Sequence, residues 1–317
     1  MAQLLTRPYE PADAPAVVDL MNLIQEHAGA HPGFTLAEME SLISGVVRDV
    51  AADTRVVVGP HGLVAAGVVA TPPEGGYRVD LLGGVHPDWR GRGIGRQLLG
   101  WQLDRAARIH AAVAPGAAWE AHTGTTLGDE SAIRLFERLG MTAARYWFEM
   151  TAPTTGAPAL ELPDGLAARR YSPDHEKALY AAHIEAFADH WGYQRRELDE
   201  WTGLTVRSDL FLPELSLLAV DGDEVVGYVL SYRDADPDRV YIGHVGVRRP
   251  WRRRGVAGAL LASVLTAAGR AGYTSAGLDV DADSPTGAVG VYERVGFGIR
   301  SRSVTYVAPL PPAPATH

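Results

Sequence analysis

The sequence predicts an α/β fold arranged as two tandem domains. The chain has 317 residues, and domains usually contain roughly 100–200 residues. The stretch WRGRGIGRQLL at 89–99 recurs as WRRRGVAGALL at 251–261, which lies 162 residues later. Within each half, short β-rich runs alternate with segments of helical periodicity, and this alternation is typical of α/β domains.

The repeat extends along each half in the same order. Tyr9-Glu10-Pro11 corresponds to Tyr171-Ser172-Pro173 at the same offset of 162 residues. Further along, FERLGM at 136–141 matches YERVGF at 292–297 at an offset of 156 residues. Three matches in one order indicate a duplication, and a period this long indicates two domains rather than a solenoid.

The segment between the two copies is rich in Pro, Gly, Ala and Thr, as domain boundaries usually are. We therefore expect an N-terminal domain at 1–151, a linker at 152–165 and a C-terminal domain at 166–308. The remaining residues, 309–317, are rich in proline and are predicted to form a disordered tail.

Each half is expected to contain a helix, a run of strands, a second helix, another strand, a short helix and a last strand. In the first half, helices are predicted at 12–28 and 94–110, and strands at 55–58, 63–70, 79–85 and 117–121. In the second half, helices are predicted at 174–188 and 256–271, and strands at 215–220, 225–232, 240–247 and 276–280. The short helices are expected to end at Gly140 and Gly296.

Composition excludes several classes of protein and site. The chain has no cysteine, so disulfides, thiolate metal sites and a cysteine nucleophile are excluded. No apolar run approaches the ~18 residues that a membrane-spanning helix needs, and the N-terminal MAQLLTRPYE lacks the pattern of a signal peptide. The net charge of −9 argues against nucleic acid or an anionic membrane as partner. We therefore expect a cytoplasmic protein.

The repeated stretch predicts an anion-binding loop. Along residues 252–257, RRRGVA, a strand ends, small residues form a turn and a helix begins. The first turn of a helix leaves backbone N–H groups unpaired and carries partial positive charge, and arginines add bidentate donors. Such a site suits a phosphate or pyrophosphate. The alternative is a solvated turn, and the dinucleotide-binding pattern GxGxxG is not met, because Arg96 follows Gly91 and Gly93 where the third glycine is required.

The pattern R-x-x-G-x-G/A between a strand and a helix resembles the coenzyme A pyrophosphate loop of the GNAT N-acetyltransferases. Both copies fit this pattern, through Arg90, Gly93 and Gly95 and through Arg252, Gly255 and Ala257. YERVGF also resembles the Y-E-x-x-G-F segment of the family, and TRPYEPAD and ARRYSPDH resemble its opening strand and first helix. The resemblance covers nearly the whole chain twice, in a layout similar to that of the mycothiol synthase group.

The resemblance implies two tandem GNAT domains, each a mixed, mostly antiparallel central sheet that is flanked by helices and splayed at the acyl-CoA site. It implies acetyl-CoA as co-substrate and no metal. Backbone groups freed by a bulge in the strand before each loop would bind it, and Gly84 and Gly246 suit such a bulge. The predicted binding residues are Val245, Val247, Arg252, Arg253, Arg254, Gly255, Val256, Ala257, Gly258 and Ser284, with Val85, Arg90, Arg92, Gly93, Ile94, Gly95 and Arg96 in the first half.

The two halves differ at the residue that would act as an acid. In the family, a tyrosine of the Y-E-x-x-G-F segment points its hydroxyl at the CoA sulfur, and Tyr292 takes this place. The corresponding residue in the first half is Phe136, which has no proton to give. We therefore predict that the C-terminal domain is catalytic and the N-terminal domain catalytically degenerate. The alternative is that both rings only pack in a core.

The resemblance does not identify the general base. The family often places Glu or His at the positions of Tyr241 and Gly243, and neither residue is an obvious base. His244 and Asp281 are the candidates, acting through a water chain. Strand alternation turns His244 to the opposite face unless a bulge shifts the register. Ser284 stands where the family commonly has Asn, which leaves that contact open.

The acceptor is expected to bind beside the segment between the first two helices of the second half. Asp189, His190 and Trp191 lie there, and with Tyr241 they are the predicted acceptor contacts, Asp189 pairing with a cationic amine. The alternative for these residues is helix packing. In the first half His27 and His31 are four residues apart, but no third ligand is apparent, so no metal is expected.

The sequence therefore predicts an N-acetyltransferase that transfers acetyl from acetyl-CoA to a primary amine of a small molecule, in the C-terminal domain. Two alternatives remain open, namely acetylation of a peptide or protein N-terminus and a non-catalytic CoA-binding sensor or scaffold. Neither nucleic acid nor a membrane is expected as a partner, and the chain is expected to be a monomer or a homodimer.

Overall fold

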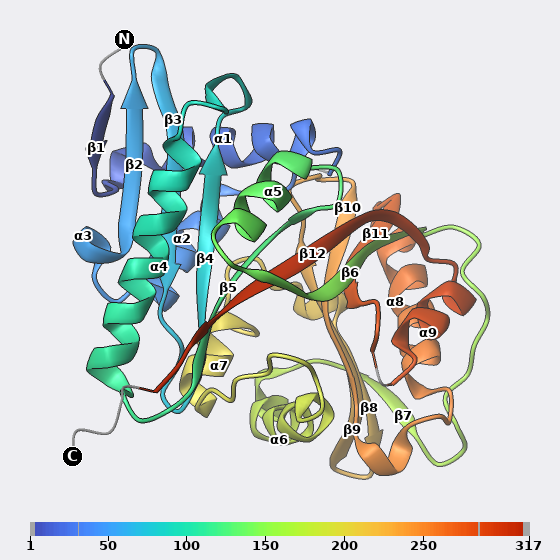
Figure 1. The fold of residues 1–317 in the computed structure, drawn as a ribbon. Coiled ribbons are helices and arrows are strands. Elements are labelled where there is room, and N and C mark those ends of the chain that lie inside the picture. Colours follow the sequence, from blue (N-terminus) through green and yellow to red (C-terminus); the bar gives the residue numbers. More distant parts are fainter. Residues whose placement is uncertain (1–3, 31, 285, 313–317) are drawn as a thin grey trace. The chain divides into compact units, whose positions relative to one another are not determined.

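A computed structural model describes residues 4–30, 32–284 and 286–312 of the chain. It contains two compact units, which are coloured along the chain in Figure 1. The first unit consists of Met1–Arg145 with the C-terminal segment from Ser303, and the second consists of Tyr146–Arg302. Among the described residues, no helix is both long enough and apolar enough to cross a bilayer.

The first unit is a six-stranded sheet with helices packed against it. Its strands lie in the order β1-β2-β3-β4-β5-β12, and only the β4–β5 pair is parallel. The strands are β1 (Leu5–Arg7), β2 (Thr54–Gly59), β3 (Gly62–Ala70), β4 (Arg78–Val85), β5 (Trp119–Thr126) and β12 (Gly298–Leu310). The helices are α1 (Ala14–His27), α2 (Leu36–Val46), α3 (Val50–Asp53), α4 (Ile94–Val113) and α5 (Glu130–Arg138).

The second unit repeats this design. Its strands lie in the order β6-β11-β10-β9-β8-β7, and only the β10–β11 pair is parallel. The strands are β6 (Thr142–Pro153), β7 (Ala167–Arg170), β8 (Leu217–Asp221), β9 (Glu224–Arg233), β10 (Arg239–Val247) and β11 (Ser275–Asp281). The helices are α6 (Glu176–Phe187), α7 (Leu198–Leu204), α8 (Val256–Arg270) and α9 (Ala288–Val295). The predicted mixed, mostly antiparallel sheet with flanking helices is thus confirmed for both units.

The last strand of each sequence half completes the sheet of the other half. From Trp147 to Pro153, β6 pairs with β11, and from Ser303 to Leu310, β12 pairs with β5. The compact units therefore do not coincide with the ranges 1–151 and 166–308, because sequence order alone does not tell which sheet an edge strand joins. Pro309 and Leu310, which were assigned to a disordered tail, are paired residues of β12, whereas 313–317 lie outside the described residues.

Both sheets splay at their parallel pair of strands. The β4–β5 pairing covers only Arg78–Asp80, and the β10–β11 pairing covers only Arg239–Tyr241. Beyond these residues β10 stays paired with β9 and β11 stays paired with β6. The splay therefore leaves one backbone edge of β10 open, directly before the loop that leads to α8.

A bulge decides which side chains of β10 face which helices. The register of β10 against β9 shifts between Ile242 and His244, so Gly243 is the extra residue. Beyond the bulge, Val245 and Val247 pack into the core beneath α8, as Ile242 does. Gly246, which was expected at a bulge, lies instead against the ring of Tyr228. The contact is so close that a Cβ at this position would come within 2.4 Å of that ring. Gly84 in the first unit likewise makes room, for Ile24 of α1.

Candidate active site

The loop before α8 presents unpaired backbone donors. Gly255 has φ of 87° and ends the turn, and Val256 begins the helix. The first N–H to bond back into the helix is that of Ala259, which donates to Gly255 O over 3.0 Å. The N–H groups of residues 256–258 therefore point out of the first turn, where the helix dipole favours an anion. The first unit has the same geometry, with φ of 83° at Gly93 before α4.

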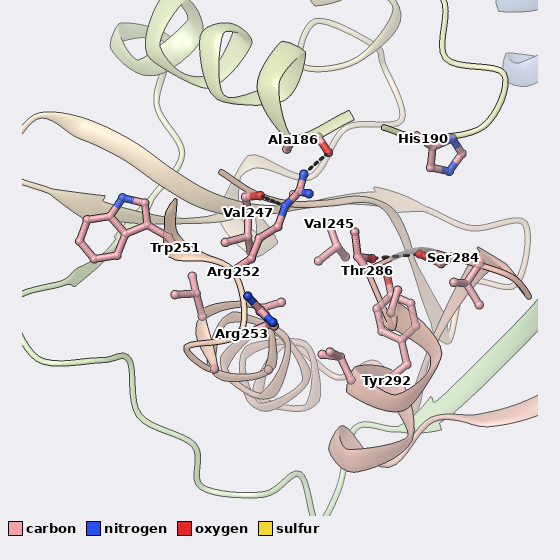
Figure 2. Close-up of a pocket in the computed structure, with 18 of the residues that line it drawn as sticks. Ala186, His190, Val245, Val247, Trp251, Arg252, Arg253, Ser284, Thr286 and Tyr292 are labelled. Carbon is pink, nitrogen blue, oxygen red and sulfur yellow. Dashed lines mark hydrogen bonds between the residues drawn. The ribbon is translucent and has the colours of Figure 1, made fainter. Parts of the chain in front are cut away.

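The three arginines of the second loop have different roles. Arg252 donates to Val247 O (3.2 Å), to Ala186 O (3.0 Å) and to Asp189 (3.1 Å), so its guanidinium braces the loop. Arg254 stacks on Trp251, with its Cζ 4.9 Å from the ring centre. Neither Arg253 nor Arg254 has a hydrogen bond or ion pair with any residue that the structure describes, but Arg254 is held against the Trp251 ring, so Arg253 is the arginine of the loop that makes none of these contacts with the described residues. Figure 2 shows Arg252 reaching Val247 and Ala186, with Arg253 beside the start of α8.

A cavity of about 1320 Å³ opens between this loop, β10, β11 and α9. It brings together most of the residues that the sequence predicts for the second site. Its wall includes residues 252–258, Val245, Val247, Asp281, Ser284, Tyr292, Asp189, His190 and Trp191. The wall does not include His244 or Tyr241.

The open edge of β10 forms one side of this cavity. Arg248 N–H donates to Val226 O of β9 over 2.9 Å. Because N–H directions alternate along a strand, the N–H groups of Val247 and Val245 point to the opposite edge, where β11 has splayed away. Two backbone donors thus face the cavity, next to the anion-binding turn.

Tyr292 extends from α9 into the same cavity. Its side chain is 8% exposed, and burial raises the pKa of its hydroxyl to about 12. None of the described residues hydrogen-bonds to this hydroxyl, and Figure 2 shows the ring beside Ser284, Thr286 and Val245. In the first unit Phe136 is 7% exposed and packs on Tyr306, with ring centres 5.4 Å apart.

His244 lies on the other face of β10, away from the cavity. Its Nδ1 is 3.1 Å from the Tyr232 hydroxyl, and its ring packs against His183 and Phe187 of α6. Burial lowers the pKa of His244 to about 4, so the ring is neutral at pH 7 and a weak base. The role of His244 as a base for an amine in the cavity is therefore not supported. Because the bulge shifts the register, Tyr241 packs on this same face.

Sequence reasoning missed a buried histidine, His183, near the segment of Asp189, His190 and Trp191 that was expected to contact the acceptor. His183 shares a hydrogen bond of 2.8 Å with the Tyr228 hydroxyl and stacks on Phe187 at 4.5 Å. Burial lowers the pKa of His183 to about 3. His183 and His244 are separated by 61 positions in the sequence, and no local motif links them, so only the fold brings their rings within 5.6 Å.

Asp189 is not a free carboxylate. Arg249 donates to both of its oxygens, at 2.6 and 3.2 Å, and Arg252 donates to Oδ2 at 3.1 Å. Hydrogen bonds from these two arginines lower the pKa of Asp189. That Asp189 pairs with a cationic amine stays a prediction, but its carboxylate is already shared by Arg249 and Arg252.

His190 and Trp191 form an aromatic wall with a third residue. The ring of Trp147 lies 6.0 Å from His190 and 6.1 Å from Trp191. Trp147 is on β6, and Asp281 of β11 lies directly opposite it in register. The sequence assigned Trp147 to the other domain, so its place beside the acceptor segment could not be read from the repeat.

The two aspartates of β11 differ in their surroundings. Asp281 is 3% exposed, and its Oδ1 accepts a hydrogen bond of 2.9 Å from Asp283 N–H, so it holds the turn after β11. Asp279 also lines the cavity, is exposed, and accepts a hydrogen bond of 3.0 Å from the Tyr241 hydroxyl. Tyr241 thus reaches the cavity through Asp279.

The first-unit loop is braced internally. Arg90 donates to Val85 O (3.4 Å) and to both oxygens of Asp129, the N-cap of α5, at 3.1 and 2.9 Å. Arg92 stacks on Trp89 at 4.5 Å. The other predicted residues there line the start of α4: Ile94 is buried, Gly95 faces Leu135 of α5, and Arg96 is exposed.

The two histidines at 27 and 31, for which no metal was expected, cannot both be placed. His27 ends α1, whereas His31 lies outside the described residues. Within the described part of the chain, no group of three or more His, Cys, Asp or Glu side chains is placed to hold a metal ion.

Comparison with known proteins agrees with this geometry in both units. Residues 177–297 match the acetyltransferase (GNAT) family and residues 50–141 match the acetyltransferase (GNAT) domain. The mycothiol acetyltransferase of Thermobispora bispora is 35% identical over 71% of this chain and 72% of its own length. That of Salinispora arenicola is 32% identical over 93% of this chain and 94% of its own length.

Solved structures share the tandem arrangement. A GCN5-related N-acetyltransferase from Sphaerobacter thermophilus has a TM-score of 0.82 at 32% identity, covering 99% of this chain and 98% of its own. A tandem GNAT protein from the clavulanic acid biosynthesis pathway has a TM-score of 0.73 at 18% identity, covering 98% of this chain and all of its own, and shows the fold alone. The chain therefore belongs to the GNAT acetyltransferase family and is a tandem GNAT N-acetyltransferase, for which the family implies acetyl-CoA as the acetyl donor.

Proposed function

We propose that the second unit transfers an acetyl group from acetyl-CoA to a primary amine of a small molecule. The observation that carries this proposal is the Tyr292 hydroxyl, which faces a cavity that also contains the open edge of β10 and the first turn of α8. Relatives that match over most of the chain are named mycothiol acetyltransferases, which supports a small-molecule acceptor over a protein N-terminus.

The groups along one side of the cavity fit acetyl-CoA. The free N–H groups of residues 256–258 and the guanidinium of Arg253 suit the pyrophosphate, and the left-handed Gly255 leaves the approach to them clear of side-chain atoms. The N–H of Val245 suits an amide of the pantetheine arm. When bound, the co-substrate supplies the acetyl thioester. The N–H of Val247 is then placed to donate to the carbonyl oxygen as negative charge develops there.

Tyr292 stabilises the leaving sulfur. Because the pKa of Tyr292 is about 12, the hydroxyl keeps its proton at pH 7 and can donate a hydrogen bond as the C–S bond breaks. A thiol has a pKa of about 8.5, well below that of Tyr292, so full proton transfer from the tyrosine is unfavourable. Solvent supplies the final proton through this hydroxyl, and the tyrosine contributes mainly the hydrogen bond to a developing anion.

The proposal is tested by measuring free thiol released from acetyl-CoA in the presence of a panel of small primary amines. Amine-dependent release, with the acetylated amine identified by mass spectrometry, is the expected result. Release with peptide N-termini but with no small amine would contradict the acceptor class. A protein that binds acetyl-CoA tightly but turns over no amine would instead be a CoA-binding sensor.

A further inference from the structure

We propose that Asp279, held by Tyr241, is the group that accepts the proton from the attacking amine. This deepens the proposed function and rests on it. An amine attacks only in its neutral form, and a free primary amine has a pKa of roughly 10, so the site needs a proton acceptor. His244 faces away from the cavity, and Asp281 is buried and bonded to the turn after β11. Asp279 is the exposed carboxylate of β11 on the cavity wall.

One hydrogen bond orients the Asp279 carboxylate and leaves its other oxygen available. The Tyr241 hydroxyl donates to Oδ2 over 3.0 Å, whereas Oδ1 has no hydrogen-bond partner in the part of the chain that the structure describes. Tyr241 therefore positions the carboxylate across the splay between β10 and β11. A carboxylate with one oxygen held and the other free can accept a proton without breaking a structural contact.

The charged groups around Asp279 are already paired with one another. Glu149 of β6 lies opposite Asp279 in register, but it accepts from Arg239 (3.2 Å) and from Ser301 (2.8 Å). Arg239 also donates to Asp234 over 2.9 Å. The charge of Arg239, which opposes protonation of Asp279, is therefore shared with Glu149 and Asp234.

The balance of these neighbours favours a more basic carboxylate. Loss of hydration beside the surrounding protein raises the pKa of Asp279, and repulsion from Glu149 and Asp234 raises it further. The hydrogen bond from Tyr241 and the charge of Arg239 oppose this rise. The nearest acid on the same strand and face is Asp281, two residues on. A raised pKa brings Asp279 closer to the pKa of the amine, which makes proton transfer from the amine to Asp279 less unfavourable.

The first unit has no carboxylate at the position that corresponds to Asp279. Its parallel pair Val79↔Ala121 corresponds to Tyr241↔Gly277, and two residues further along β5 stands Thr123 where β11 has Asp279. The Thr123 hydroxyl donates to Leu81 O over 2.9 Å, bridging β5 to β4. The first unit, which has Phe136 in place of Tyr292, therefore also has no carboxylate at the position of Asp279.

The proposed proton transfers balance the reaction. Asp279 takes one proton from the ammonium form of the substrate and releases it to solvent, which frees the nitrogen lone pair. The C–N bond then forms and the C–S bond breaks, while Asp279 takes the second proton lost from nitrogen and then releases it to solvent. The sulfur receives its proton from solvent through Tyr292. The products are the N-acetyl amide, the free thiol and one proton.

The test compares pH profiles of kcat for full-length wild type, Asp279→Asn and Tyr241→Phe, with acetyl-CoA and the best amine of the panel. Asp279→Asn should lower kcat by about 100-fold or more, the usual contribution of a general base, and should remove the acidic limb of the profile. Tyr241→Phe removes a hydrogen bond that favours the carboxylate, so the acidic limb should move to higher pH. Asp223→Asn, on the exposed turn before β9, is the charge-matched control and should match wild type.

The outcomes separate the two proposals. A wild-type protein that acetylates no primary amine overturns both. Wild-type turnover with an unchanged kcat and profile in Asp279→Asn overturns only the assignment of Asp279. If Asp279→Asn does not fold, Tyr241→Phe decides, since an unmoved acidic limb would contradict a role for Asp279.

Discussion

The two units share a fold and a loop but differ in the groups that face the splay. Where the second unit has Tyr292 and Asp279, the first has Phe136 and Thr123. At the middle of the loop, Arg253 in the second unit corresponds to Gly91 in the first, and both have positive φ, of 62° and 75°. The same turn geometry therefore occurs in both units, whereas the proposed reacting groups occur only in the second, so the loop motif by itself does not identify the unit proposed to be catalytic.

The arginine that both loops share, Arg90 in the first unit and Arg252 in the second, makes different contacts in the two units. In both, its Nε donates to the carbonyl at the end of the preceding strand. The rest of Arg90 pairs with Asp129, which is 5% exposed, so the end of β4 is tied to the start of α5. The rest of Arg252 turns to the segment after α6 instead. The second unit therefore keeps α9, which carries Tyr292, free of this ion pair.

The largest effect is expected from cutting the chain at the repeat rather than at the compact unit. A fragment of residues 154–317 lacks β6, whose Met150 is fully buried in the core under α8. A fragment of residues 146–302 keeps the six-stranded sheet. We expect the first fragment to be unfolded and inactive and the second to fold, as measured by circular dichroism and by thermal unfolding. Cooperative unfolding of 154–317 alone would show that β6 is dispensable.

A second comparison exchanges the residues on α9 and α5. Tyr292→Phe removes a hydrogen bond to a developing anion, which is worth about 1.5–3 kcal/mol, so kcat should fall about 10- to 100-fold. Phe136→Tyr adds a hydroxyl in the first unit and should leave kcat unchanged. Thiol release at saturating amine measures both. An unchanged kcat in Tyr292→Phe, or a raised kcat in Phe136→Tyr, would mean that the first unit contributes to turnover.

The smallest effect is expected from exchanging the loop residues Arg253 and Gly91. Arg253→Gly relieves a left-handed conformation that costs a non-glycine residue about 1 kcal/mol, so the variant should unfold at a slightly higher temperature. It also removes the free guanidinium, so the Kd for CoA should rise about tenfold. Calorimetric titration measures this, and Gly91→Arg is the matched change in the first unit. An unchanged Kd for CoA in Arg253→Gly would mean that the backbone N–H groups alone bind the anion.

Much of the fold follows from short patterns in the sequence. The strand–turn–helix signal placed α4 and α8 within a residue of their observed starts, because glycine and the first apolar helix residues mark that boundary locally. The difference between Tyr292 and Phe136 was likewise visible by alignment of the two halves. These features depend on neighbouring residues, which the chain order preserves.

The remaining features of the site depend on contacts between distant segments. The bulge was expected near Gly246 and lies at Gly243, because register is set by packing on both faces of β10 and not by glycine alone. Asp189 was expected to meet the substrate, but the fold places two arginines against it. His183 and Trp147 carry no motif, so only their ring contacts show that they border the acceptor side.

The sequence by itself determined the duplication, the two glycine turns before α4 and α8, and the unit that has a tyrosine on its short helix. The tertiary structure decided which sheet β6 and β12 join, which contacts each arginine of the loop makes, and which partners each carboxylate on the cavity wall has. The physical reason is that helix starts and turns are governed by local backbone energetics, whereas strand pairing and ion pairing are chosen among competing partners far apart in the chain.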